Sequence, residues 1–188
     1  ENLERLYFHN PYARADAVKD LGYTGEKAAA AVPHLIRLLG DRSEHRDLSE
    51  SVDIFVIDGD EELLADKVVD ALVMRPDSDF GPSATLAEVA AGPLVAALRH
   101  RDPLIRLRAA VALGKIRVSI VAKHLPAAAG DPKRVGAALA GIVRRLCIEG
   151  LTHRDPFIRE EAMHVLKERG DPRSVAELAA ATKSAERR

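Results

Sequence analysis

Six basic side chains are the best candidates in this sequence for contact with a partner molecule: Lys27, His34, Arg37, Arg99, Arg144 and Arg145. Helical spacing places them on the sides of their helices that face away from the apolar residues, where they would form a basic strip. Such groups bind carboxylates and phosphates. Ordinary solvation is the plainest interpretation of the strip, an acidic segment of a partner protein the second, and nucleic-acid phosphate the third.

Two short motifs match protein-kinase triplets, but the residues around them do not support kinase chemistry. Residues 45–47 read His-Arg-Asp and residues 79–81 read Asp-Phe-Gly. A kinase catalytic loop needs Asn five residues after its Asp to hold the second magnesium ion, and that position is Val52. The sequence also has no glycine-rich phosphate loop or Val-Ala-x-Lys strand upstream. We therefore reject kinase activity.

The remaining reactive residue types form no recognisable catalytic or metal-binding pattern. None of the seven histidines has another histidine three or four residues away. Glu161 and His164 make one Glu-x-x-His, whereas a di-iron helical bundle needs two such pairs and further glutamates. We assign no catalytic residue, no metal ligand and no cofactor. An active site that converges from separate parts of the fold stays an open alternative.

The overall composition favours packed helices and indicates no general affinity for nucleic acid or membranes. Aromatic residues make up 4% of the 188 residues, Trp is absent, and the net charge is -1. This charge gives no general attraction to nucleic acid or to anionic membranes, and no apolar run is long enough to span a bilayer. The one cysteine, Cys147, cannot form an internal disulfide. We expect a buried thiol in a reduced, cytoplasmic setting.

A recurring sequence unit must position the basic residues. It begins with Asp or Asn before Pro and occupies residues 10–22, 102–114 and 155–166. The first side chain caps a helix, and proline fits the first helical position. An arginine stands four residues after each cap: Arg14, Arg106 and Arg159. A small residue, which lets a neighbouring helix come close, stands seven residues after each cap: Ala17, Ala109 and Ala162.

Two further patterns support the repeat. An apolar stripe at helical spacing follows the cap in two copies of the unit, so Leu113 and Leu166 are expected to be buried. Its members are Ile105, Ala109, Ala112, Leu113 and Ile116, then Ile158, Ala162, Val165 and Leu166. The tripeptide His-Arg-Asp starts at residues 45, 100 and 153, at intervals of 55 and 53 residues (100 − 45 and 153 − 100). Each copy lies between two expected helices.

The predicted elements follow from apolar periodicity and from Gly and Pro positions. Pro33 predicts a kink or a late helix start, and residues 92–93 (Gly-Pro) predict a bend. Residues 41–60 fit a helix or a short strand, and we favour the helix because a lone strand among helices has no pairing partner. The expected helices are 11–21, 26–39, 61–74, 84–99, 102–117, 118–125, 133–150, 156–169 and 171–182.

The pattern Asp-Pro-x-Ile-Arg-x-x-Ala-x-x-x-Leu-Gly, with a following helix such as Ala-Val-Pro-His-Leu-Ile-Arg-Leu-Leu, resembles HEAT repeats. It looks most like the bacterial variety first described in phycobilisome lyases. The resemblance covers residues 10–41 and 102–182 well and 42–101 poorly. It implies an all-α, right-handed α-solenoid of stacked helix pairs whose second helices line a concave face. Residues 1–188 would then form one domain, with repeat units at about 10–41, 42–101 (degenerate), 102–152 and 153–182.

The resemblance also implies a structural role for the repeated arginines. Arg14, Arg106 and Arg159 would bond to acidic groups of adjacent turns. For Arg106 and Arg159 we expect Asp102 and Asp155 as the first candidates. Such ion pairs would lie partly buried at the boundaries between units.

The resemblance is nearly silent on function, because the family includes scaffolds, adaptors, chromophore-lyase subunits and some DNA glycosylases. We expect a non-catalytic protein-binding scaffold or adaptor that holds a protein partner with an acidic segment on its concave face. One alternative is a HEAT-like DNA-binding or DNA-repair protein, against which the neutral charge and the missing Trp argue. Another is a lyase-like helper subunit that acts on a chromophore-bearing protein.

Overall fold

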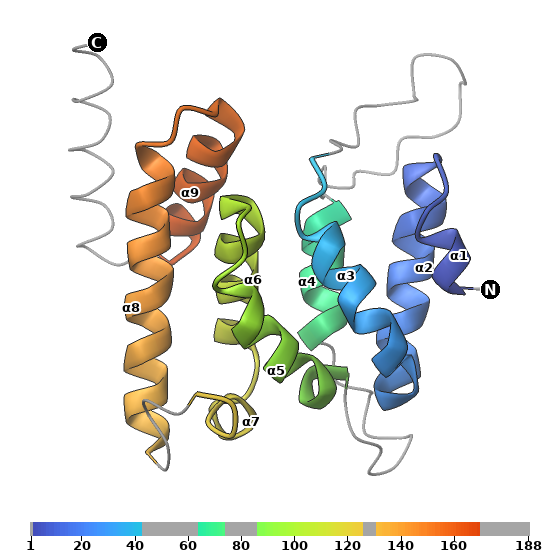
Figure 1. The fold of residues 1–188 in the computed structure, drawn as a ribbon, viewed down its shortest axis with the longest axis horizontal. Helices are drawn as coiled ribbons and strands as arrows, with labels where there is room; N and C mark the ends of the chain where they lie inside the picture. Colours follow the sequence, from blue (N-terminus) through green and yellow to red (C-terminus); the bar gives the residue numbers. More distant parts are fainter. Residues whose placement is uncertain (1, 43–63, 74–85, 126–130, 170–188) are drawn as a thin grey trace. The chain divides into compact units, whose positions relative to one another are not determined.

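The computed structural model describes residues 2–42, 64–73, 86–125 and 131–169, which form helices joined by turns, without strands (Figure 1). The prediction of an all-α chain is confirmed for this part. The chain packs as two compact units, Glu1–Pro93 and Leu94–Arg188. Whether they act as one domain stays a prediction. None of the described helices combines the length and apolarity that crossing a membrane requires.

The first unit is built around α2, which spans Pro11–Thr24 and packs against α4, Leu64–Val73. The predicted end of α2 at residue 21 is too early, because Gly22 lies inside the helix. A Cβ atom at Gly22 would lie 3.1 Å from the Cα of Ala71, so the missing side chain allows the two helices to approach closely. Gly25 ends α2 with a φ of 63°, a backbone conformation that favours glycine.

Pro33 divides the second predicted helix. A 3-10 helix, η1, runs over Gly25–Ala31, and α3 then begins at Val32 and ends at Leu38. Proline lacks an amide hydrogen and its ring would clash with the carbonyl four residues earlier in a continuous α-helix. The late start of the α-helix is therefore the outcome that Pro33 imposes. Val32 and Leu35 are the buried side chains of α3, which contacts both η1 and α4.

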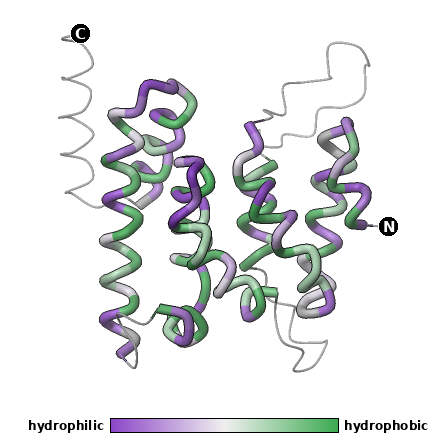
Figure 2. Tube along the Cα trace, in the orientation of Figure 1, coloured by the Kyte–Doolittle hydropathy of each residue, from purple (hydrophilic) through white to green (hydrophobic). Residues whose placement is uncertain are grey.

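The second unit centres on α6, Pro103–Lys115, which packs against α8, Pro132–Leu151, and α9, Pro156–Arg169. A short helix, α7, spans Val118–Val121 and contacts α8. One core cluster draws on all three long helices: Leu107, Ala110, Val143, Leu146, Cys147, Ala162, Val165 and Leu166. Figure 2 shows how hydrophobic and hydrophilic residues alternate along these helices.

The apolar stripe predicted for α6 and α9 is buried. Leu113 is fully buried, and Leu166 nearly so. More of α6 is buried than the stripe predicts, because Leu104, Leu107 and Ala110 are also buried. A helix that is covered on more than one side buries more than a single stripe of residues.

The small-residue prediction is confirmed most clearly where α8 meets α9. A Cβ atom built at Gly150 would lie only 2.8 Å from the Cβ of Ala162. Ala17, Ala109 and Ala162 are all fully buried. Small residues at these places allow close packing of neighbouring helices, as the repeat unit predicts.

Two predicted helices of the second unit match the structure closely. The predicted helix 156–169 coincides with α9, and 133–150 is within one residue of α8 at each end. The predicted helix 84–99 is observed as α5, Leu86–Ala97, with Pro93 inside it. The division between the two units falls directly after this proline. The helix at 171–182 and nearly all of 41–60 lie outside the described residues.

Candidate functional site

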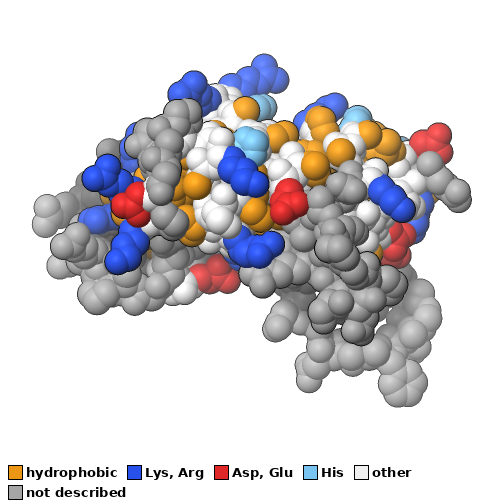
Figure 3. All heavy atoms as spheres, turned by 90° about the horizontal axis from the view of Figure 1, so that it is seen from below, with side chains coloured by type: hydrophobic (Ala, Val, Ile, Leu, Met, Phe, Trp, Pro, Cys, Tyr) orange, Lys and Arg blue, Asp and Glu red, His pale blue; other side chains and the backbone are white. Residues whose placement is uncertain are grey.

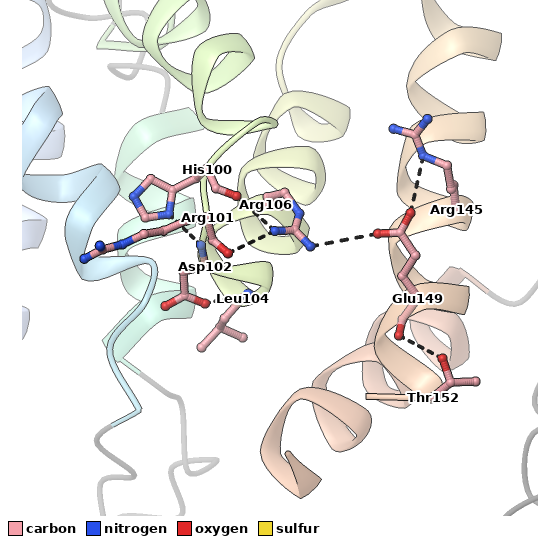
Figure 4. A network of polar contacts seen from close by, with 8 residues as sticks. All are labelled: His100, Arg101, Asp102, Leu104, Arg106, Arg145, Glu149 and Thr152. Atoms are coloured by element: carbon pink, nitrogen blue, oxygen red, sulfur yellow. Dashed lines mark hydrogen bonds and ion pairs between the residues drawn. The ribbon is translucent and has the colours of Figure 1, made fainter. Parts of the chain in front are cut away.

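The turn that precedes α6 is held by a network of polar contacts around Asp102 and Arg106 (Figure 4). The Asp102 Oδ1 atom accepts a hydrogen bond from the Leu104 amide at 2.9 Å, which caps the helix. The Asp102 amide donates to Nδ1 of His100 at 3.1 Å. Arg106 Nη1 donates to the carbonyl oxygens of His100 and Arg101, at 2.9 and 3.2 Å. The His-Arg-Asp tripeptide at residues 100–102 is therefore a structural turn.

The turn before α9 repeats these contacts residue for residue. Asp155 Oδ1 accepts from the Phe157 amide at 3.1 Å, and the Asp155 amide donates to Nδ1 of His153 at 3.1 Å. Arg159 Nη1 donates to the carbonyl oxygens of His153 and Arg154, at 2.9 and 3.0 Å. Because the equivalent atoms make the same bonds 53 residues apart (153 − 100), the repeat seen in the sequence is also a repeat in geometry.

The start of α2 shows a reduced form of the same turn. Arg14 Nη1 donates to the carbonyl oxygens of Phe8 and His9, at 3.0 and 3.5 Å. These carbonyls stand six and five residues before the arginine, as they do for Arg106 and Arg159. We call this contact of an arginine with two preceding carbonyls the arginine clamp.

The clamp corrects the predicted partners of the repeated arginines. Asp102 and Asp155 cap their helices and, among the contacts of the described residues, make no ion pair with Arg106 or Arg159. A capping carboxylate is occupied by a backbone amide at the helix start. The arginine, one turn later, reaches back over the preceding carbonyls instead.

Acidic residues that face two of the clamp arginines lie at or just after the end of a later helix. Arg14 Nη2 lies 3.4 Å from Asp41 Oδ2, just after α3. Arg106 Nη2 lies 3.9 Å from Glu149 Oε2, in the last turn of α8. Arg14 therefore has an acidic partner at 3.4 Å, whereas Arg106 makes only a loose ion pair, and sequence reasoning singled out neither acid. Arg159 donates to its two carbonyls, and the prediction of an aspartate partner for it is wrong within the described part of the chain.

A buried ion pair between Arg108 and Glu161 was missed by sequence reasoning. Arg108 is 1% exposed and Glu161 8%. The contact is bidentate, with Arg108 Nε 2.8 Å from Oε1 and Nη2 3.1 Å from Oε2. The guanidinium carbon also lies 5.7 Å from the centre of the Phe157 ring. The sequence held a signal for this pair, because both charged residues fall inside an apolar stripe. Arg108 stands three positions after Ile105, and Glu161 three positions after Ile158.

This pair occupies both carboxylate oxygens of Glu161, which accept from Arg108 in the core. The second member of the Glu-x-x-His motif, His164, is exposed and lies 3.5 Å from Glu168. No group of three or more possible metal ligands occurs among the described residues.

The basic strip divides between the two units, with three members in each. In the first unit, Lys27 and Arg37 are exposed, and His34 is partly buried. The His34 Nδ1 atom is hydrogen-bonded to the Tyr7 hydroxyl, and the two rings meet edge to face with centres 5.7 Å apart. His34 and Arg37 lie one turn apart on α3, and Lys27 precedes them in η1.

In the second unit, Arg99 and Arg145 are exposed and Arg144 is partly buried. Arg145 Nε lies 3.8 Å from Glu149 Oε1, one turn later on α8. Figure 4 shows Glu149 between Arg145 and Arg106, two arginines from different helices. The face in Figure 3 shows Lys and Arg side chains scattered among hydrophobic and acidic ones.

No family model matches the sequence, and no curated protein matches it. The likeness to HEAT repeats therefore stays an interpretation of the sequence pattern, now accompanied by the recurring turns before α6 and α9.

Proposed function

We propose that this chain is a HEAT-like helical-repeat scaffold, a right-handed α-solenoid, that binds an acidic segment of a partner protein without catalysing a reaction. The observation that best supports the proposal is the arginine clamp, which recurs at the starts of α2, α6 and α9. Helices that start with the same geometry in each repeat can stack in the same way. Stacked repeats expose an extended surface, and binding is its usual use.

The exposed charges on the second helices of the repeats favour an acidic partner. Arg37 on α3 and Arg145 on α8 are both exposed, and each precedes an acidic residue by four positions, Asp41 and Glu149 respectively. Exposed guanidinium groups form bidentate hydrogen bonds with carboxylates. The chain's net charge of -1 argues against a general affinity for nucleic acid, so the basic residues would act locally.

The proposal is tested by isolating the partner and measuring its direct binding. The full chain is used as bait in an extract of its native host, captured proteins are identified by mass spectrometry, and each candidate is purified and titrated. We expect a protein with an acidic segment whose affinity falls as salt rises, because exposed charges are screened over about 8–10 Å at physiological ionic strength. Tight, lesion-specific binding of duplex DNA in a parallel titration would overturn the proposal.

A further inference from the structure

Glu149 lies between two arginines without a close bond to either. Its Oε2 atom is 3.9 Å from Arg106 Nη2, and its Oε1 atom is 3.8 Å from Arg145 Nε. Both distances exceed those of a charge-assisted hydrogen bond, about 2.7–2.9 Å. The Glu149 side chain is 52% exposed. It therefore makes two loose ion pairs at the surface of the second unit.

Arg106 is already oriented for a carboxylate. The arginine clamp fixes its Nη1 atom through two carbonyl oxygens at 2.9 and 3.2 Å, so the other terminal nitrogen, Nη2, is left facing Glu149 (Figure 4). A guanidinium group held in this way loses little further freedom when it binds a ligand. Arg145, exposed on α8, supplies a second cation on the other side of Glu149.

The equivalent acid in the first unit is held more tightly. Arg14 lies 3.4 Å from Asp41, and these side chains are 14% and 17% exposed. The corresponding side chains of Arg106 and Glu149 are 25% and 52% exposed. The acid that faces the clamp arginine is thus partly buried in one unit and open in the other. Only the open contact can exchange its carboxylate without uncovering buried groups.

We propose that Arg106 and Arg145 form a carboxylate site that Glu149 fills in the free protein, and that a carboxylate of an acidic partner segment displaces Glu149. This inference rests on the proposed function. The group that already fills the site is a carboxylate, so the site fits an Asp or Glu side chain of the partner. Glu149 then acts as an internal competitor, and the affinity for the partner is multiplied by the fraction of time that the site is open.

The experiment measures the affinity of the full chain for a synthetic oligoglutamate peptide by titration calorimetry. Glu149→Gln removes the competitor, and we expect binding about two- to fivefold tighter, the range that a surface ion pair allows. Glu168→Gln is the matched control, because it removes the same charge from the far end of α9, where Glu168 contacts His164. Adding Arg145→Gln to the Glu149→Gln variant should abolish the gain.

The results show whether the displacement, the proposed function or both fail. A gain for Glu149→Gln that exceeds that of Glu168→Gln and depends on Arg145 supports the displacement. Equal effects of the two glutamine variants, with the peptide still bound by the unchanged protein, would overturn the displacement and leave the scaffold proposal standing. If neither the unchanged protein nor any variant bound the peptide, both would be overturned.

Discussion

Arg108 and Glu161 occupy the same position in two successive copies of the repeat unit, six residues after the capping aspartates Asp102 and Asp155, and they meet in a buried ion pair. Both guanidinium contacts are short, at 2.8 and 3.1 Å. Opposite charges at equivalent positions join α6 to α9, 53 residues apart. Two arginines or two glutamates at these positions would place like charges together in the core. The pair therefore helps to specify which helices pack together.

Removing one partner of this pair should destabilise the protein strongly. Glu161→Ala removes the carboxylate that accepts two hydrogen bonds from the buried Arg108, and we expect the free energy of unfolding to fall by about 3–5 kcal/mol. Replacing both residues by Met and Leu should cost less than the single change, because no charge is then left in the core. Urea melts of the two variants check the order, and a double variant less stable than Glu161→Ala would contradict it.

Leu113→Ala should cost about 2–5 kcal/mol of unfolding free energy. Leu113 is fully buried in α6, so its truncation leaves a cavity that its neighbours only partly fill. Lys167→Ala on the exposed side of α9 is the control, with an expected change within about 0.5 kcal/mol. A loss below about 0.5 kcal/mol for Leu113→Ala in urea melts would show that the stripe does not carry the core.

The arginine clamp should contribute more than a surface ion pair. Arg106→Ala removes a charged donor from two carbonyl oxygens, and we expect a loss of about 1.5–3 kcal/mol, against about 0–1 for exposed pairs. Because the clamp is made to the backbone, Arg106→Lys should recover only part of the loss, since a lysine lacks the planar fork. Thermal unfolding in low and high salt measures both variants, and a loss that disappears in high salt would indicate an ordinary surface charge effect.

The acids of the two units should differ in their importance for stability. Asp41→Asn breaks a partly buried pair with Arg14, whereas Glu149→Gln breaks two exposed contacts. We expect Asp41→Asn to lower the unfolding free energy by about 1–3 kcal/mol and Glu149→Gln by less than about 1 kcal/mol. Equal losses in parallel urea melts would mean that Glu149 is a structural tie like Asp41.

Charge reversal on the exposed second-helix arginines should weaken capture of the partner. Arg37→Glu and Arg145→Glu each place a negative charge where an acidic segment would bind, and both arginines are exposed, so the melting temperature should stay nearly unchanged. Lys19→Glu on α2 and Lys167→Glu on α9 are matched reversals of exposed lysines outside the basic strip. Partner capture that survives both arginine reversals would remove these residues from the binding surface.

The sequence by itself determined the local features of this protein. Asp before Pro predicts the helix starts at 103 and 156, and Pro33 predicts the late start of α3. These features depend on contacts within about one helical turn, between a side chain and the backbone next to it, so their causes lie close together in the chain. The apolar stripe of α6 and α9 was predictable for the same reason.

Only the tertiary structure decided which side chains meet across helices. Arg108 and Glu161 are both visible inside apolar stripes, but their pairing requires α6 and α9 to pack at one particular register. The acids that face Arg14 and Arg106 lie 27 and 43 residues further on (41 − 14 and 149 − 106), beyond the reach of local periodicity. Whether such a contact is tight, as at Asp41, or open, as at Glu149, depends on how neighbouring helices bury it.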